Sequence, residues 1–266
     1  MKNVAVIAPA GSIENPEKLI AAQNFMKQFN IETKIYPGCY ETFRGMAGCD
    51  EIRLNDLHNA YLDKDIDTII CARGGYGAIR LLDKIDYNII KNNPKKLVGS
   101  SDITALLIAI HKKTGQINYH AKMALNGISE MKTAEFLNYK NSIENNIYKY
   151  PSLGACGILW GGNLATIISL FGAPYETYIP NEDIILFIED INEPDYKIDR
   201  MLAQILRNTP LKEKIKGVIF GEFIGAGEYL NDILKEFASA LNVPRTFDPS
   251  ITHGKANTVV PFGMKI

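Results

Sequence analysis

The sequence predicts an α/β protein built on a parallel sheet. Short apolar runs alternate with segments whose apolar residues recur at helical spacing, as in parallel strands joined by helical crossovers. The apolar runs are continuous, which is typical of strands buried on both faces. The chain has 266 residues, 46% of them hydrophobic, enough for one large domain or two smaller ones with a sizeable core.

The first half of the chain carries the clearest alternation. Proline and glycine end its first two predicted strands, and the third strand runs directly into a glycine-rich loop. Sites in parallel sheets form beyond the carboxyl ends of the strands, so we expect function in the loops that follow them. Strands are expected at 4–8, 31–36, 66–72 and about 97–98, and helices at 17–29, 50–62, from 78 to 82, and from the turn at Ser101 to about His111.

The character of the sequence changes from about Glu130 to Pro151. Residues 136–154 are polar and weakly periodic, and we interpret them as a linker. This division predicts an N-terminal α/β domain at 1–135 and a C-terminal mixed α/β domain at 155–266. In the second domain, strands are expected at about 156–160, 184–188 and 216–220, and helices at 164–171, 198–206 and 230–240.

Composition narrows the possible partners and compartment. The formal charge of −1 at pH 7 predicts no broad attraction to nucleic acid or to an anionic membrane. The apolar run at the N-terminus stops at Pro9, too short for an export signal or a membrane span, so we expect a cytoplasmic protein. None of the four cysteines forms a C-x-x-C motif or has a histidine at zinc-ligand spacing. Cys71 and Cys156 lie in apolar runs and are expected to be buried thiols.

Ser101 occupies the most suggestive position in the sequence. An apolar run and Gly99 precede it, and an apolar helical pattern follows, which predicts a hydroxyl on a sharp strand-to-helix turn. A serine there commonly caps the helix. The same position suits a nucleophile, because free N–H groups and the helix dipole favour negative charge. The turn is not the G-x-S-x-G elbow, since Ile103 stands where the second glycine belongs, and Ser100 is a rival by proximity.

The loop Arg73–Gly77 follows a neighbouring strand and should lie on the same rim as Ser101. Its glycines fit a flexible turn. The spacing matches neither of the common phosphate-binding motifs. A third interpretation is a loop whose bare N–H groups stabilise an oxyanion, and the shared rim favours it. The planar fork of Arg73 suits a substrate carboxylate.

A nucleophilic serine needs a base and a group that orients the base. Glu189 ends a strongly apolar strand, so it is expected to be partly buried, and a buried carboxylate needs a partner such as a histidine N–H. His58 and His111 fit surface positions. His120 and His253 remain the two candidates for the base.

The motifs described above, together with several further segments in a fixed order, make the chain resemble the LD-carboxypeptidase family of serine peptidases (family S66). This family includes the microcin C immunity peptidases. The resemblance runs along almost the whole chain. The segments that carry it are Ala8–Gly11, Arg73–Ala78, Gly99–Leu106, Trp160–Leu164, Leu186–Asp190, Asp199–Leu202 and His253–Gly254.

The resemblance implies a Ser-Glu-His triad, which matches Ser101, Glu189 and His253 here. It also implies an active-site cleft between the two domains, an oxyanion hole formed by the N–H groups of Gly75 and Asp102, a homodimer, and no metal or cofactor. The implied activity is release of terminal D-alanine from the L-diamino-acid–D-alanine bond of murein tetrapeptide. The residues expected to bind this small peptide are Arg73, Gly74, Tyr76, Trp160 and Asn163.

Two other functions stay open at this point. One is hydrolysis of peptidyl or aminoacyl-adenylate conjugates, as in the immunity branch of the family. The other is a small-ligand binding protein that kept the rim loops and lost the chemistry. A complete Ser101, Glu189 and His253 set argues against the second.

Overall fold

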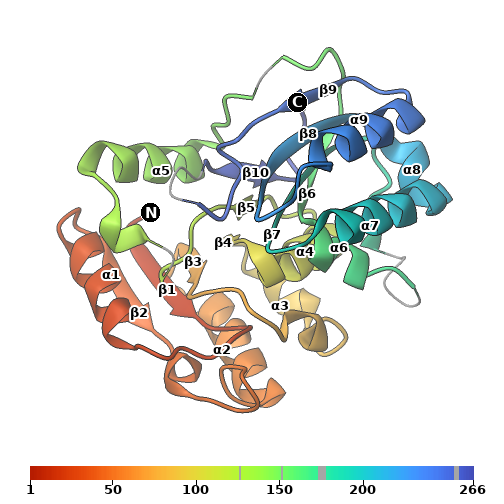
Figure 1. Ribbon diagram of the computed structural model, residues 1–266. Helices are drawn as coiled ribbons and strands as arrows, with labels where there is room; N and C mark the ends of the chain where they lie inside the picture. Colours follow the sequence, from red (N-terminus) through yellow and green to blue (C-terminus); the bar gives the residue numbers. More distant parts are fainter. Residues whose placement is uncertain (126, 151, 173–177, 255–257) are drawn as a thin grey trace.

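The computed structural model describes residues 1–125, 127–150, 152–172, 178–254 and 258–266, and it contains two sheets (Figure 1). The strands of the first sheet are β1 (Asn3–Ile7), β2 (Glu32–Ile35), β3 (Thr68–Cys71), β4 (Lys96–Gly99), β5 (Asn118–His120) and β10 (Val260–Phe262). Those of the second are β6 (Ile158–Asn163), β7 (Ile184–Ile191), β8 (Ile215–Ile224) and β9 (Arg245–Phe247). The helices are α1 (Glu17–Lys27), α2 (Asp50–Leu62), α3 (Tyr87–Asn92), α4 (Thr104–Thr114), α5 (Thr133–Asn145), α6 (Leu164–Ser169), α7 (Asp195–Arg207), α8 (Thr209–Lys214) and α9 (Leu230–Leu241).

The first sheet has the order β10-β5-β4-β3-β1-β2 and is parallel except for β10. Because side chains alternate along a strand, its apolar strands contribute to two separate cores. Val4 and Val6 pack with α1 and α5, whereas Ala5 and Ile7 pack with α2 and α4. The continuous apolar runs therefore reflect burial on both faces, as the sequence predicts. The loops after β1, β3 and β4 all leave from the same edge.

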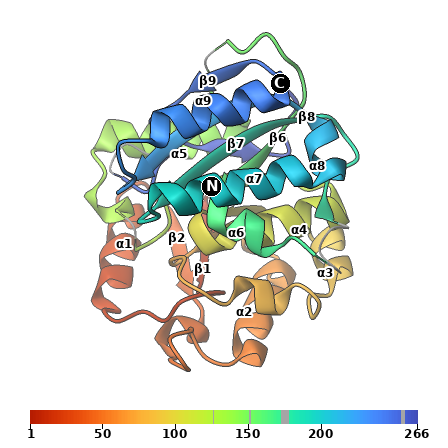
Figure 2. The same ribbon diagram turned by 45° about the vertical axis from the view of Figure 1, so that its right-hand side comes forward.

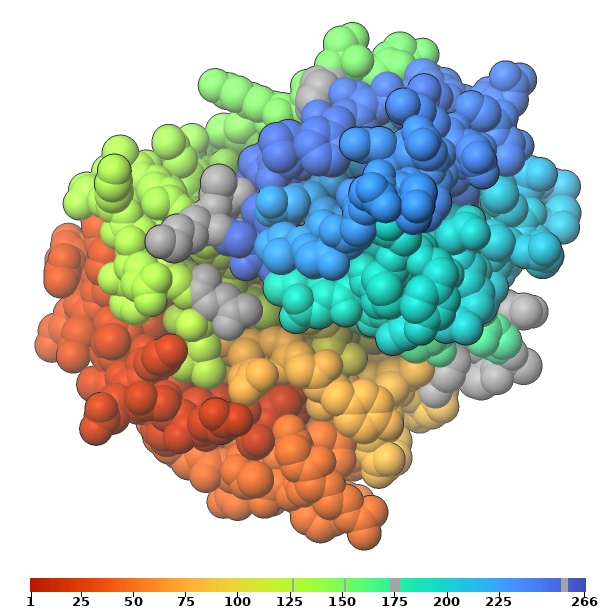
Figure 3. Space-filling model, in the orientation of Figure 1, coloured from red at the N-terminus to blue at the C-terminus, as the bar shows by residue number. Residues whose placement is uncertain are grey.

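Helix α4 lies between the two sheets (Figure 1). Its first seven residues, 104–110, are all buried, and a helix that is apolar all round must be covered on every side. It packs against β4 and β5 of the first sheet and against β6 and α6 on the other side. Since Ser101 lies just before α4, this packing fixes the serine turn against the C-terminal half of the chain. Figure 3 shows the two halves meeting on one face of the molecule.

The second sheet has the parallel order β6-β7-β8-β9. Figure 2 shows α7 and α9 side by side in front of its strands. Each helix buries one stripe, and the stripe of α7 consists of Ile198, Met201, Leu202 and Ile205. Strand β7 lies between β6 and β8, so Glu189 near its end is enclosed by its neighbours.

The chain returns to the first sheet at its end. Strand β10 pairs antiparallel with β5, with Val260 opposite His120. Pro261 is tolerated there because β10 is an edge strand. The segment 155–266 thus contributes strands to both sheets. The exact domain boundaries stay a prediction.

The expected linker 136–154 begins as a helix instead. Residues 133–145 form α5, and its buried side chains Phe136, Tyr139 and Ile143 share one face of the helix. Phe136 packs on Phe25 and Phe29 beside α1, with ring centroids 5.1 and 4.6 Å apart. Three apolar side chains are enough for a helix that only caps the edge of a core. The other elements that the sequence analysis did not predict are α3, α8, β5, β9 and β10.

Two smaller expectations also differ. Cys156 is exposed and not a buried thiol, because β6 begins only at Ile158, whereas Cys71 is buried as expected. Residues 78–81 form a 3-10 turn rather than a longer helix.

Among the described residues, none of the helices combines the length and the apolar composition that crossing a membrane requires.

The packing of α5 yields a stability prediction. Phe136→Ala should lower the free energy of unfolding by about 3–5 kcal/mol, because Phe136 is fully buried among aromatic rings. Leu137→Ala is the matched control, since Leu137 is 49% exposed on the same helix and should change stability by no more than about 0.5 kcal/mol. Urea denaturation measures both. Equal effects at the two positions would show that α5 is not packed as described.

Candidate active site

Ser101 lies on the sharp turn between β4 and α4. Its φ of +59° is in the left-handed region, which costs a residue with a Cβ some energy and is concentrated at functional sites. The turn also requires Gly99, because a Cβ there would meet the side chain of Ile103 at 2.5 Å. The geometry thus places the hydroxyl on a strained corner and holds it there through the packing of α4.

The loop after β3 comes into direct contact with this corner. A Cβ on Gly74 would lie 2.7 Å from the Ser101 Cβ and 2.9 Å from its Oγ, so only glycine fits. The amide nitrogen of Asp102 lies 3.4 Å from the same point. Gly75 has a φ of +113°, and the N–H of Gly11 holds the loop by donating to the Gly74 carbonyl at 3.0 Å. Bare backbone therefore lines one side of the serine.

Asp102 ties the corner to the far end of the same loop. The N–H of Ala78 donates to its carboxylate at 2.8 Å. Burial raises the pKa of Asp102 to about 6, against the lowering effects of this hydrogen bond and of the charge on Arg53. The side chain of Asp102 thus has a structural role, which leaves its backbone N–H beside Ser101.

Arg53 anchors the two glycine loops from behind. It is buried on α2 and donates from Nη1 to the carbonyls of Pro9 and Gly77, each at 2.8 Å. Its Nη2 contacts Asp50 at 2.5 Å, and Arg80 binds the same carboxylate from the surface. Arg53 was not predicted from the sequence, because a charged residue in a helix of mostly polar residues gives no signal of burial.

Glu189 is completely buried at the end of β7 and contacts two histidines. Its Oε2 is 2.5 Å from Nδ1 of His253, and its Oε1 is 3.4 Å from Nε2 of His120. Burial by itself would raise the pKa of Glu189. The hydrogen bonds and charges of the two histidines outweigh burial, so the pKa is lowered and the carboxylate is ionised.

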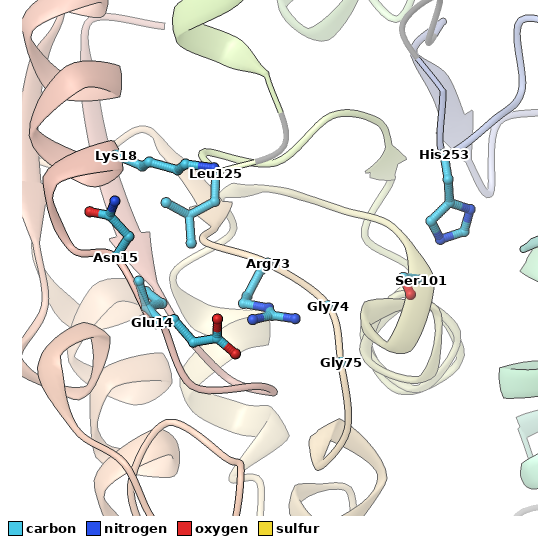
Figure 4. Close-up of a pocket in the computed structure, with 10 residues that line it drawn as sticks. Glu14, Asn15, Lys18, Arg73, Gly74, Gly75, Ser101, Leu125 and His253 are labelled. Atoms are coloured by element: carbon cyan, nitrogen blue, oxygen red, sulfur yellow. The ribbon is translucent and has the colours of Figure 1, made fainter. Parts of the chain in front are cut away.

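His253 lies between this carboxylate and the cavity that contains Ser101. Burial lowers the pKa of His253, but the hydrogen bond and charge of Glu189, together with the charge of Asp190, raise it on balance. Figure 4 shows the His253 ring above Ser101. Its Nε2 is buried and makes no hydrogen bond within the described part of the chain. This nitrogen is therefore the one available to act on the serine.

The loop around His253 is attached to the end of β8. The hydroxyl of Thr252 donates to Glu222 in a very short hydrogen bond, and the N–H of Gly254 donates to the same hydroxyl at 2.7 Å. The N–H of Glu222 in turn donates to the Ile251 carbonyl at 2.9 Å. Hydrogen bonds made by the residues just before and just after His253 thus fix the position of the histidine.

The cavity beside the serine has a volume of about 430 Å³ (Figure 4). Its walls come from the loops after β1, β3 and β4, from Leu125, and from the His253 loop. The guanidinium of Arg73 donates to the Ser12 carbonyl at 2.9 Å. The lining residues are Ile13, Glu14, Asn15, Lys18, Arg73, Gly74, Gly75, Ser101, Leu125 and His253.

Three residues expected to bind substrate lie elsewhere. Tyr76 is 58% exposed and is not among the described residues that line the cavity. Trp160 is 3% exposed and packs near Phe262 in the core. Asn163 caps α6 and donates to Asp190 at 2.9 Å. In contrast, Glu14 and Asn15 of the loop after β1 and Lys18 at the start of α1 line the cavity, although this segment carries no motif that points to a site.

Of the two histidines left open as bases, the structure places His253 in the cavity and His120 on the far side of Glu189. Within the described ranges, no group of three or more histidine, cysteine, aspartate or glutamate side chains has an arrangement that could hold a metal ion.

Known proteins match the chain along nearly its full length. The family description "LD-carboxypeptidase N-terminal domain" matches residues 4–121, and "LD-carboxypeptidase C-terminal domain" matches residues 156–266. A probable murein peptide carboxypeptidase of Bacillus subtilis (strain 168) is 31% identical, with 98% of this chain and 87% of the relative covered.

Solved structures match equally well. The crystal structure of muramoyltetrapeptide carboxypeptidase from Oxalobacter formigenes has a TM-score of 0.86 at 26% identity, with 99% of this chain and 93% of that chain covered. The microcin C7 self-immunity protein has a TM-score of 0.85, with 99% and 92% covered, but at 20% identity this likeness shows the fold alone.

The anchoring role of Arg53 can be tested by stability. Arg53→Met should lower the free energy of unfolding by about 3–5 kcal/mol, because it leaves two buried carbonyls without their donor and removes the buried cation that pairs with Asp50. Arg80→Met removes an exposed partner of the same Asp50 and should cost about 1 kcal/mol or less. Thermal or urea unfolding compares the two. A smaller loss for Arg53→Met than for Arg80→Met would contradict this role.

Proposed function

Because the chain belongs to the LD-carboxypeptidase family of serine peptidases, we propose that it hydrolyses the bond between an L-diamino acid and the terminal D-alanine of murein tetrapeptide, a step of cell-wall recycling. Two of the similar proteins carry names that refer to murein peptides. The observation that carries the proposal is the cavity shared by Ser101 and His253, with Glu189 paired to His253 behind it.

The proposed reaction is acyl transfer through Ser101. Nε2 of His253 takes the hydroxyl proton while Oγ attacks the scissile carbonyl, and Glu189 holds the ring and stabilises its charged form. The amide bond breaks when His253 returns the proton to the leaving nitrogen, and D-alanine departs. Water, activated by the same histidine, then hydrolyses the ester and restores Ser101.

The oxyanion hole of this proposal is formed by the N–H groups of Gly75 and Asp102. The close approach of the Gly74–Gly75 backbone to Ser101 supports it, because a side chain there would block a carbonyl oxygen. Each such donor is worth about 3 kcal/mol of transition-state stabilisation in other hydrolases. The tie between Asp102 and Ala78 keeps both donors on one rigid frame.

The cavity suits the charged end of a short peptide. A guanidinium has five N–H donors, so the bond from Arg73 to Ser12 leaves others for a terminal carboxylate. Glu14 and Lys18 line the same cavity and offer both signs of charge to a diamino-acid side chain. A volume of about 430 Å³ is within the range of small-ligand sites.

The family resemblance also supports a homodimer in the cytoplasm, and we include both in the proposal. Sedimentation of the purified protein tests whether it is a homodimer. A monomer at the concentrations used for activity would remove the dimer from the proposal without affecting the triad.

The substrate proposal predicts a clear preference. The protein should release D-alanine from a murein tetrapeptide and lose most of that rate when the terminal carboxylate is amidated, because Arg73 then has no anion to bind. A peptidyl-adenylate conjugate, as in the immunity branch, is assayed in parallel. Faster hydrolysis of the conjugate, or no effect of amidation, would contradict the carboxypeptidase assignment.

The pairing of Glu189 with His253 predicts a pH effect. The charge of Glu189 raises the pKa of His253, so Glu189→Gln should lower that pKa and move the acidic limb of the kcat/KM profile to lower pH. Loss of the orienting anion should also reduce kcat by about 10³- to 10⁴-fold. The check is a pH–rate profile of both proteins from stopped D-alanine assays. An unchanged acidic limb would mean that Glu189 does not act on the base.

A further inference from the structure

His120 is a second histidine at the candidate site, and the proposed reaction gives it no role. It is the last residue of β5 and is 1% exposed. The sheet fixes its place, because it lies opposite Gly99 of β4 on one side and Val260 of β10 on the other. The ring of Phe187 packs edge-on against its own at 5.5 Å, which limits rotation. Strand pairing and the Phe187 ring thus fix the imidazole on the strand beside β4, which leads into the Ser101 turn.

The hydrogen-bond needs of Glu189 identify what this ring does. An ionised carboxylate only accepts hydrogen bonds, and its burial is costly unless each oxygen has a donor. His253 is the partner of Oε2, and the partner of Oε1 is His120 at 3.4 Å. Within the described ranges, no lysine or arginine pairs with this carboxylate. His120 therefore supplies the donor that Oε1 would otherwise lack.

The surroundings also fix the tautomer of His120. Its Nε2 must carry the proton, because the facing oxygen can only accept. Its Nδ1 is buried and has no hydrogen-bond partner among the residues described. A proton on Nδ1 would be a buried donor without an acceptor, which is unfavourable. The ring therefore serves as a hydrogen-bond donor to Glu189 through Nε2 and not as a general base.

We propose that His120 is a positioning residue that donates from Nε2 to Glu189 and so holds the carboxylate with its other oxygen facing His253. The proposal rests on the Ser101–His253–Glu189 triad of the proposed function. It also makes the triad dependent on the contact between the sheets, since His120 belongs to the first sheet and Glu189 to the second.

Three titratable groups of the described residues bear on Glu189 and on the expected pH effect. His120 faces it from β5, His253 faces it from the loop after β9, and Asp190 follows it on β7. Burial and the charge of Glu189 raise the pKa of Asp190, whose carboxylate has its own donors at Asn163 and Ala165. Without His120, Glu189 would accept a proton more readily from solvent or share one more strongly with His253. Both effects move the acidic limb of activity to higher pH.

The test compares three substitutions at this position, with D-alanine release from murein tetrapeptide as the readout. Loss of a residue that orients a ligand or catalytic group commonly costs about 10- to 100-fold, so His120→Phe should reduce kcat by this factor, with KM changed by less than about threefold. The acidic limb of the kcat/KM profile of His120→Phe should move to higher pH, which is opposite to the direction expected for Glu189→Gln. His120→Gln, whose amide N–H can reach the same oxygen, should restore kcat and the acidic limb most of the way to wild type.

His120→Asn keeps a polar side chain that is too short to reach Glu189. It should behave as His120→Phe does, and it replaces that variant if the phenylalanine protein fails to fold, as judged by circular dichroism and thermal unfolding. Equal activity of the glutamine variant and the folded Phe or Asn variant would overturn the proposal. So would a wild-type pH profile in the variants that lack the donor.

His253→Ala separates this proposal from the triad on which it rests. It should abolish turnover whatever the role of His120. If His253→Ala stays active, the triad is wrong. His253→Ala can instead be inactive while His120→Gln is folded and equally inactive. In that case the triad stands, and the proposal that His120 acts only as a hydrogen-bond donor is wrong.

Discussion

The ionised, fully buried carboxylate of Glu189 is the constraint on which the site depends. A buried charge is stable only when it is paired and hydrogen-bonded, and here both partners are histidines that come from other parts of the chain. The neighbouring strand makes room for this group, because a Cβ on Gly221 would lie 2.9 Å from the Cβ of Glu189. The fold therefore has to bring β5, β7 and the His253 loop together before the charge is tolerated.

A different constraint applies around Ser101. The backbone of the neighbouring segments must approach the serine turn more closely than a side chain would allow. Gly74 and Gly99 each occupy a place where a Cβ would collide with its neighbours, and Ser101 itself adopts a left-handed φ. Two contacts stabilise this strained conformation. Helix α4 is buried between the sheets, and Arg53 donates hydrogen bonds to the loops after β1 and β3. Rigid support on both sides keeps the hydroxyl and the neighbouring N–H groups in fixed relation, as catalysis by prepositioned donors requires.

Sequence reasoning was most informative where a physical rule is local. Continuous apolar runs predict the buried parallel strands, and the glycine spacing predicts the tight turn at Ser101, because these features depend on neighbouring residues. The helix α5 was missed because three apolar positions, Phe136, Tyr139 and Ile143, give a weak periodic signal in a polar segment. The choice between His120 and His253, and the burial of Arg53, depend on contacts between residues far apart in the chain, which no spacing rule reveals. The family resemblance, and not the residue pattern alone, favoured His253.

The direct test of the account is the rate of D-alanine release from murein tetrapeptide by Ser101→Ala beside Ser100→Ala. The two serines are adjacent, but only Ser101 lines the cavity, while Ser100 is 6% exposed and precedes the turn. The account predicts a loss of about 10⁵- to 10⁶-fold in kcat for Ser101→Ala in a protein that unfolds like the wild type, and a far smaller loss for Ser100→Ala. Retained turnover in a folded Ser101→Ala protein, or the larger loss at Ser100, would contradict it.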